Sequence, residues 1–334
     1  MRWLKKIFRF FLNLCIALVI FLALLEVAFR NYWVDFYSAE FEALNTASDL
    51  SNRNGPTVLV GGDSFTGVQH SYVQTMRSER PNARIVNAGI PGTGVTEAAC
   101  FLPDRIAEWQ PEVFIYQIYV GNDLFDIRHP VGSEHIGTAR KIYWWLSDRL
   151  RCVRYINYKL AQFRYRFTTE VGNAPSELNE EFSVETYAAR QKMNFAAEPA
   201  LVYNSAFLQE GRRADFEVLL NELDALMDAL PDSCKSYLLV IPHCAQVSDR
   251  YARNMQVLGA QFPDDVDMLE IRNPLVLGLD SVYRENPRVE LLSAQPFLQE
   301  VERKGNAIYY SDDPHLNELG HQMLGNVMAI TVPE

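Results

Sequence analysis

Short apolar segments alternate with longer segments of helical periodicity over most of this chain. Apolar runs that follow turn-forming residues are typical of buried strands, and they cover residues 57–60, 84–86, 113–119, 237–241 and 307–310. Apolar positions three and four residues apart predict helices at residues 69–78, 95–109, 213–229 and 319–329. This alternation favours an α/β fold in which helices cover both faces of a parallel sheet.

The segment at about residues 124–210 departs from this alternation. It is rich in Tyr, Phe, Trp and Arg, and its apolar residues recur at helical spacing, which predicts a helical insertion. The insertion could form a cap over a substrate cleft or could pack against the outer face of the sheet. The sequence alone does not distinguish these two roles.

An apolar stretch at residues 10–29 has about the length that a membrane-spanning helix requires. Because four basic residues precede it, residues 1–9 are expected in the cytoplasm, and the chain from the linker at residues 30–55 onward is expected outside it, in the periplasm or at the cell surface. A cleavable signal peptide is the main alternative, but no small-x-small cleavage site follows Leu25. A buried core helix fits less well, because the stretch has almost no polar face.

The rest of the chain is predicted to form one domain at residues 56–332, and composition excludes some classes of function for it. The chain of 334 residues is 48% hydrophobic, which is sufficient for a substantial core. Its formal net charge of −11 provides no broad basic surface, which argues against a nucleic-acid partner. The five cysteines have no C-x-x-C spacing and the histidines do not cluster, so neither a metal site nor a dithiol redox motif is predicted.

Ser64 follows the first predicted strand in the sequence Gly61-Gly62-Asp63-Ser64. We expect it at the start of a helix, where unpaired N–H groups favour developing negative charge. A serine hydroxyl becomes a useful nucleophile only when a base removes its proton. Taken alone, Ser64 is explained equally well as an ordinary helix cap.

The last predicted loop contains a candidate base, His315, preceded by two acids, Asp312 and Asp313. Either carboxylate could accept the Nδ1 hydrogen of the imidazole and orient Nε2 toward Ser64. One short loop would then supply both the base and the group that orients it.

Two further polar segments follow the second and third predicted strands, and they contain Gly89 and Asn122. Loops at the carboxyl ends of parallel strands are where open sheets bind ligands. The N–H groups of Ser64 and Gly89 and the side-chain amide of Asn122 are therefore candidate donors to an oxyanion. Gly89 could instead serve only a turn, and Asn122 could only cap or turn the chain.

In their order and placement, these four segments resemble the SGNH (GDSL-like) hydrolases, a family named for the Ser, Gly, Asn and His of four sequence blocks. The resemblance spans residues 58–325. It implies a three-layer α/β/α, flavodoxin-like fold and serine-dependent hydrolysis or transfer of esters. No metal or organic cofactor is expected, because the chain itself supplies the nucleophile, the base and the oxyanion donors. It assigns Ser64 as the nucleophile, His315 as the base, and Gly89 and Asn122 as oxyanion donors.

The resemblance does not fix every detail of the site. Asp312 fits the Asp-x-x-His spacing that is commoner in the family and Asp313 fits Asp-x-His, so Asp312 is slightly preferred as the orienting acid. Val120 stands where the third block often has glycine, so that loop could differ. An α/β-hydrolase elbow, Gly-x-Ser-x-Gly, is not formed, because Thr66 occupies the last glycine position.

The N-terminal apolar helix and its ending, Leu-Glu-Val-Ala-Phe-Arg, are similar to a membrane-anchored bacterial branch of the family. Members of that branch often act on O-acyl groups of surface polysaccharides. The resemblance therefore implies an O-acyl or O-acetyl ester of an envelope carbohydrate as the substrate. A lipid esterase, an acyltransferase with the same triad, and a non-catalytic envelope scaffold are the alternatives.

Overall fold

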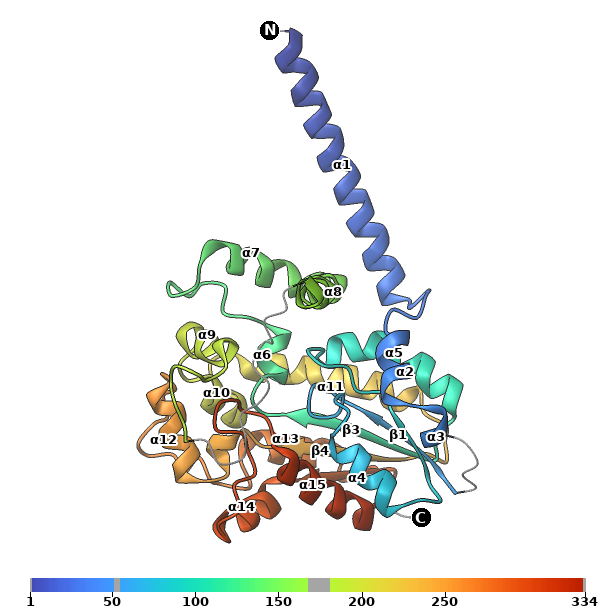
Figure 1. Cartoon of the computed structure of the whole chain (residues 1–334), viewed down its shortest axis with the longest axis vertical. Coiled ribbons are helices and arrows are strands. Elements are labelled where there is room, and N and C mark those ends of the chain that lie inside the picture. The colour runs from blue at the N-terminus through green and yellow to red at the C-terminus, as the bar shows by residue number, and fades with distance from the viewer. Residues whose placement is uncertain (1, 51–54, 168–180, 333–334) are drawn as a thin grey trace.

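The computed structural model describes residues 2–50, 55–167 and 181–332, and Figure 1 shows them as a sheet enclosed by helices, with one helix projecting from the body. Residues 51–54 of the predicted linker and 168–180 of the predicted insertion lie outside the described residues.

Within the described residues, five parallel strands form a single sheet in the order β2-β1-β3-β4-β5. Their bounds are β1 (Thr57–Gly61), β2 (Arg84–Asn87), β3 (Val113–Tyr119), β4 (Lys235–Ile241) and β5 (Val289–Ser293). This order is that of flavodoxin-like, doubly wound sheets, in which ligands bind where the strand order reverses. The predicted α/β/α fold is confirmed, and the reversal point lies between β1 and β3.

Four of the five predicted strands are confirmed as β1 to β4, and the fifth prediction is wrong. Residues 307–310 contribute only an isolated bridge between Tyr309 and Leu316. Ile308 and Tyr309 are apolar because they are buried in the core, not because they extend the sheet. The true fifth strand, β5, is a half-buried edge strand whose weak apolar pattern did not predict it.

Alternate side chains of the strands enter two separate cores, one on each face of the sheet. On β3, for example, Ile115 packs on one face and Phe114 and Tyr116 pack on the other. The first face is covered by α4 (Tyr72–Glu79), α12 (Asp249–Val257), α14 (Gln295–Arg303) and α15 (Glu318–Thr331). The second is covered by α5 (Val95–Trp109), α11 (Arg212–Asp228) and α13 (Pro274–Tyr283). The four predicted covering helices correspond to α4, α5, α11 and α15.

The described part of the insertion is helical, as predicted. It comprises α6 (Asp123–Ile127), α7 (Thr138–Ser147), α8 (Cys152–Phe167), α9 (Ala189–Ala197) and α10 (Leu201–Phe207). Figure 1 shows α7 and α8 on the side of the body from which the long N-terminal helix projects, beyond α6 and above the sheet. Shorter elements complete the chain, namely α2 (Ser38–Leu44), α3 (Ala47–Leu50) and the 3-10 turn η1 (Cys244–Gln246).

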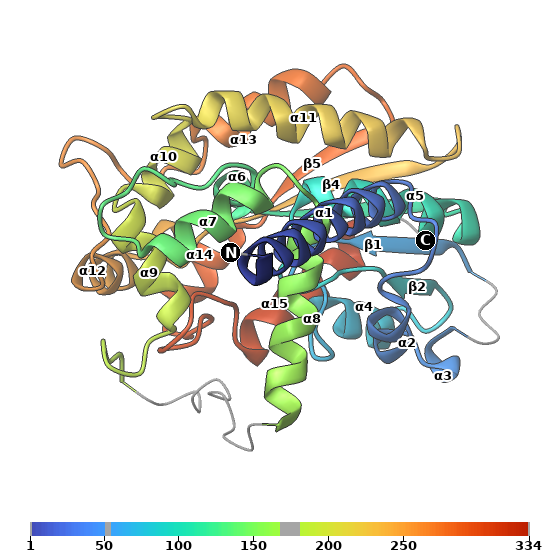
Figure 2. The same cartoon turned by 90° about the horizontal axis from the view of Figure 1, so that it is seen from above.

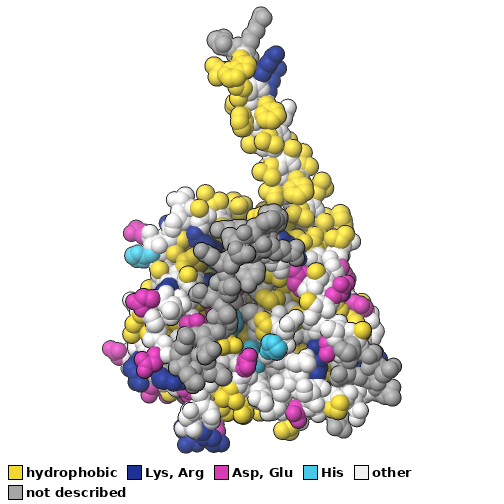
Figure 3. Space-filling model, in the orientation of Figure 1, with side chains coloured by type: hydrophobic (Ala, Val, Ile, Leu, Met, Phe, Trp, Pro, Cys, Tyr) yellow, Lys and Arg dark blue, Asp and Glu magenta, His cyan; other side chains and the backbone are white. Residues whose placement is uncertain are grey.

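The projecting helix is α1 (Arg2–Arg30), and Figure 3 shows it covered with hydrophobic side chains along most of its length. Its segment Trp3–Arg30 is long and apolar enough to cross a membrane, with a mean hydropathy of 2.6 and only 6% of the most apolar window buried. That small buried share contradicts the core-helix alternative, whereas a membrane span and a signal sequence both fit.

The last turn of α1 belongs to the folded body. Phe29 is fully buried, with its ring against those of Phe36 and Tyr155, and the Glu26 side chain is largely buried as well. The Glu26 carboxylate accepts the backbone N–H groups of Arg151, at 3.1 Å, and Cys152, at 2.9 Å, where α8 begins. Viewed from above in Figure 2, α8 emerges from under α1 and runs outward.

Candidate active site

Ser64 lies in a tight turn at the carboxyl end of β1, next to the point where the strand order reverses. A Cβ at Gly62 would come within 2.5 Å of the Gln117 side-chain oxygen, so a residue without a side chain is needed just before the turn. The Gly67 N–H donates to the Asp63 carbonyl at 2.8 Å and closes it. The expected helix start at Ser64 is wrong, because this single turn is not continued and α4 begins further along the chain.

The imidazole of His315 contacts the Ser64 hydroxyl. The distance from Ser64 Oγ to His315 Nε2 is 2.7 Å, which is within hydrogen-bonding range. The structure therefore brings together two residues separated by 251 positions in the sequence. The backbone N–H of Ser64 has no hydrogen-bond partner among the described residues, so it is free to donate to a bound ligand.

The other imidazole nitrogen, His315 Nδ1, is hydrogen bonded to a carboxylate oxygen of Asp313. The same oxygen accepts the backbone N–H of His315 at 2.9 Å, which is the two-residue turn that aspartate readily forms. The preference for Asp312 is therefore corrected. Asp312 instead accepts the Ala188 N–H with its backbone carbonyl, at 2.7 Å.

The loop that carries His315 is held from several directions. The Tyr310 N–H donates to the His315 carbonyl at 3.1 Å, and the Asn317 side chain caps α15 through the Gly320 N–H at 2.9 Å. The Phe65 ring lies with its centroid 4.8 Å from that of the imidazole. These contacts fix the ring that faces Ser64.

Electrostatics around the imidazole favour its protonated form. Burial alone would lower the pKa of His315, but the hydrogen bond and charge of Asp313, together with the charge of Asp63, raise it overall. Burial also acts against ionisation of Asp313, yet the contact with His315 lowers the pKa of this carboxyl. The pair is thus arranged to stabilise an imidazolium next to a carboxylate, as a base that accepts the serine proton requires.

Asn122 lies beside this pair, at the start of α6. It lines a small cavity of about 70 Å³ that Ser64, Gly121 and His315 also line. Its side-chain N–H donates to Asp126 at 2.9 Å, and its side-chain oxygen is buried without a partner among the described residues. The amide group is therefore held by Asp126 at the edge of the space next to the Ser64 hydroxyl.

Gly89 does not reach that space. Its N–H donates to the Asn87 side-chain oxygen at 3.0 Å, and Gly89 lines neither of the cavities around Ser64. A Cβ at this position would come within 2.7 Å of the Gly67 nitrogen, so the glycine allows β2 and the Ser64 turn to approach closely. The expectation that the Gly89 amide is an oxyanion donor is therefore corrected. In the same loop, Gly92 adopts φ +76° and lines a neighbouring cavity.

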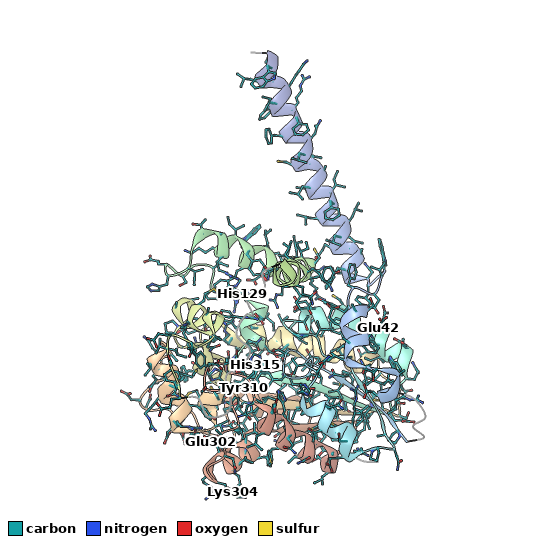
Figure 4. All side chains as sticks on the ribbon, in the orientation of Figure 1. Glu42, His129, Glu302, Lys304, Tyr310 and His315 are labelled. Carbon is teal, nitrogen blue, oxygen red and sulfur yellow. The ribbon has the colours of Figure 1, made fainter. Side chains whose placement is uncertain are left out.

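Two cavities open from the Ser64–His315 pair. The small one described above lies toward α6 and α9. A larger one, of about 430 Å³, lies on the other side of the pair and is lined by residues such as Val68, Tyr310 and Leu316. Figure 4 shows His315 and Tyr310 close together in the centre of the body, with His129 on the side of α7 and α8.

Sequence reasoning missed two residues that shape the site. Gln117 accepts the N–H of Asp63 at 3.1 Å and contacts the Thr66 hydroxyl at 3.2 Å, so it supports the Ser64 turn from β3. A glutamine inside an otherwise apolar strand was an available signal for such a role. Arg190, from α9, lines the small cavity, and no local pattern distinguishes it from a surface arginine.

The arrangement is suited to nucleophilic catalysis. A hydroxyl, an imidazole and a carboxylate are hydrogen bonded in sequence at the junction of two cavities, which is the geometry that activates a serine. Within the described ranges, no group of three or more His, Cys, Asp or Glu side chains is placed to hold a metal ion.

No protein-family model matches the chain, and no curated protein matches it. Solved structures resemble it at low identity. An α/β hydrolase, LAE5, from the metagenome of Lake Arreo in Spain is 16% identical, with 84% of this chain and 96% of that chain covered and a TM-score of 0.40. The acetyl xylan esterase AlAXEase is 11% identical, with 83% and 100% covered and a TM-score of 0.39.

The catalytic domain of the peptidoglycan O-acetyltransferase OatA from Streptococcus pneumoniae is 8% identical, with 83% of this chain and 92% of that chain covered and a TM-score of 0.36. Likenesses at this level carry no functional conclusion. The strand order of the sheet establishes the fold of this chain.

Proposed function

We propose that this chain is a serine esterase that cleaves O-acyl esters through an acyl-Ser64 intermediate. The observation that carries the proposal is the 2.7 Å contact between the Ser64 hydroxyl and His315 Nε2, with Asp313 bound to the opposite ring nitrogen. A base in this position can take the serine proton as the hydroxyl attacks.

In the proposed reaction, Ser64 Oγ bonds to the ester carbonyl carbon while its proton passes to His315 Nε2. The resulting oxyanion accepts hydrogen bonds from the Ser64 N–H and the Asn122 side-chain amide. Collapse of this intermediate breaks the bond to the alcohol, which leaves with the proton from His315. Water then attacks the acyl-serine, again with His315 as the base, and releases the acid and free Ser64.

Labelling with a fluorophosphonate probe tests the nucleophile directly. We expect covalent labelling of the full-length protein at Ser64, and no labelling of the Ser64→Ala variant. A matched control is Ser78→Ala, which removes an exposed hydroxyl on α4 that donates a hydrogen bond to the Gln74 carbonyl at 3.2 Å. A wild-type protein that reacts no faster than Ser64→Ala would refute the esterase and would favour a non-catalytic envelope scaffold.

The proposed substrate is an O-acetyl or other O-acyl ester of an envelope carbohydrate, with a lipid ester as the alternative. Esters of acetate and of long-chain acids on the same alcohol separate the two. A carbohydrate O-acetyl esterase should prefer acetate, whereas a strong preference for long chains would indicate a lipid esterase.

An acyltransferase is the second candidate, and the two cavities that meet at the triad favour it. An acyl donor in one cavity and an alcohol acceptor in the other would both reach Ser64. The chemistry is the same until the second step, in which an alcohol takes the place of water. Product analysis with and without a glycan acceptor decides between them, because a transferase should form a new ester at the expense of free acid.

We further propose that α1 is a membrane span that holds the domain against the outer side of the cytoplasmic membrane. Protease treatment of intact spheroplasts tests this orientation. The domain should be degraded while a short N-terminal fragment is protected, and a processed, soluble protein would instead indicate a signal sequence.

A further inference from the structure

A third cavity adjoins the small cavity that contains Ser64. Its volume is about 390 Å³, and it lies among α6, α7, α8 and α9. Arg190 and Asn194 line both cavities, so the two spaces meet along one side of α9. Figure 4 shows His129, which lines this third cavity, on the side of His315 toward α7 and α8. A substrate bound at Ser64 can therefore extend into it.

The lining of this third cavity is cationic and aromatic, although the chain as a whole carries a net charge of −11. Three arginines line it, Arg140, Arg154 and Arg190, together with the rings of Tyr143 and Tyr158. Arginine presents planar, bidentate donors that suit carboxylate and phosphate groups. Tyrosine rings provide flat surfaces with a polar end, on which a sugar ring can lie.

The three arginines differ in how fully they are already paired. Arg154 is buried and donates to Glu97 at 3.1 Å, so its charge is neutralised within the fold. Arg140 is exposed, and among the described residues its guanidinium contacts no carboxylate, only the face of the Tyr143 ring at 5.4 Å. Its donors are therefore available to a ligand.

Arg190 is held only loosely. Its side chain is 58% exposed, and its nitrogen lies 3.4 Å from Asp126, longer than a good charged hydrogen bond. Asp126 already accepts the Asn122 amide at 2.9 Å and faces His129 at 3.4 Å. Among the described residues that line the cavity, Asp126 is the one carboxylate beside the three arginines.

We propose that this cavity is a substrate subsite for an anionic group, a carboxylate or a phosphate, on the alcohol part of the ester. Arg140 and Arg190 bind the anion, and the sugar ring that carries it lies against Tyr143 and Tyr158. The inference rests on the proposed function, because it places the ester carbonyl at Ser64. It deepens that function by naming the substrate class as acylated acidic saccharides.

An acyl chain is a poor occupant for the same cavity. Packing alkyl groups against Arg140, Arg190 and Asn157 would remove their polar groups from water without replacing the lost hydrogen bonds. An anion, in contrast, satisfies donors that the fold leaves open.

Binding measurements separate this inference from the proposed chemistry. The full-length Ser64→Ala protein serves as the host, because it cannot turn over an ester, and calorimetric titration measures its affinity for three acetylated methyl glycosides. One is neutral, one carries a uronate carboxylate and one carries a sugar phosphate. The last two distinguish the sources of the anion. We expect at least one anionic ligand to bind tenfold or more tightly than the neutral one, and to weaken as salt is added.

Replacing both arginines, Arg140→Gln and Arg190→Gln, should reduce this anionic preference by about tenfold to a hundredfold, as expected for losing one or two hydrogen bonds between charged groups. The matched control for each single substitution is Arg253→Gln on α12, which also removes one positive charge, at an exposed arginine outside the cavity, and it should keep the full preference. Near-UV circular dichroism verifies that each variant is folded, and each single substitution should lose part of the preference.

Two outcomes would overturn the subsite. One is equal affinity of the host protein for the neutral and both anionic glycosides. The other is an anionic preference that survives in the folded double variant. Both are distinguishable from failure of the esterase, which would appear as absent fluorophosphonate labelling of Ser64 in the wild-type protein, whatever the glycosides do.

Discussion

Asp312 and Asp313 are neighbours in the sequence just before His315, but replacing each by asparagine should affect catalysis very differently. In Asp313→Asn, the carboxylate that contacts Nδ1 of His315 becomes a neutral amide. In Asp312→Asn, that contact is untouched, and the backbone carbonyl that accepts the Ala188 N–H remains. The two variants thus remove the same charge one residue apart.

The expected magnitude follows from the charge that the reaction creates on the imidazole. About a third of the His315 side chain and of the Asp313 side chain is exposed, so an effective dielectric constant of about 20 is suitable for this pair. At that value, two unit charges about 4 Å apart attract each other by about 4 kcal/mol. Loss of about 4 kcal/mol of transition-state stabilisation lowers the rate by roughly 10³-fold. An asparagine amide can also donate to Nδ1, which would leave the proton on Nε2 and misdirect it toward Ser64. In serine proteases the analogous change costs about 10⁴-fold in kcat.

Steady-state hydrolysis of an activated acetyl ester provides the assay. We expect kcat/KM of Asp313→Asn to fall by about 10³-fold to 10⁴-fold, and that of Asp312→Asn to fall by less than about tenfold, or about 1.4 kcal/mol. Thermal unfolding of both variants separates a catalytic loss from a folding defect. If a folded Asp313→Asn protein keeps kcat/KM within tenfold of the wild type, Asp313 is not the acid that orients His315. If kcat/KM of Asp312→Asn falls a thousandfold, Asp312 has that role instead.

Three further predictions concern the same site. Protonation of His315 removes the base, and the pKa of His315 is raised in the fold. The fall of kcat/KM toward acid pH should therefore have an apparent pKa above the usual 6.5 of histidine, and an apparent pKa below 6.5 would contradict the assignment of His315. Asn122→Ala should lower kcat by about 10²-fold to 10³-fold with an unchanged melting temperature, and an unchanged kcat would exclude Asn122 as an oxyanion donor. In Gly121→Ala, the added Cβ would lie 2.4 Å from the Tyr119 ring, whose hydroxyl contacts the Pro314 carbonyl at 3.3 Å. We expect a loss of about 1–3 kcal/mol in stability, measured by denaturant unfolding, and slower fluorophosphonate labelling.

The sheet could be predicted from the sequence wherever a strand is buried on both faces. The run at 113–119 is apolar apart from Gln117, and its predicted bounds are those of β3, because a short apolar run that follows a turn-forming residue such as Pro111 is typical of a strand buried on both faces. The edge strand β5 escaped prediction, since Glu290 is exposed and its neighbours are only half-buried. An apolar run at 307–310 was mistaken for a strand because burial in a loop selects the same residues as burial in a sheet.

The sequence predicts which loops meet at the candidate site, but it does not predict which atoms in those loops contact one another. Strand ends bring Ser64 and Asn122 to the same edge of any parallel sheet, so their proximity follows from topology. The choice between Asp312 and Asp313 depends instead on a local turn that spacing alone does not reveal. Likewise, nothing in the sequence shows that the Asn87 side chain already occupies the Gly89 amide.

Glu26 interrupts the apolar pattern of α1, and its contacts identify where this helix joins the folded body. In the sequence it only interrupts an apolar stretch that otherwise reads as a membrane span. In the structure its carboxylate accepts two backbone N–H groups at the start of α8, where the unpaired donors of a helix favour a negative charge. The apolar part of α1 that can enter a membrane therefore ends before Glu26. Because α8 also lines the cationic cavity through Arg154 and Tyr158, the contact ties the base of the proposed anchor to the wall of the proposed subsite.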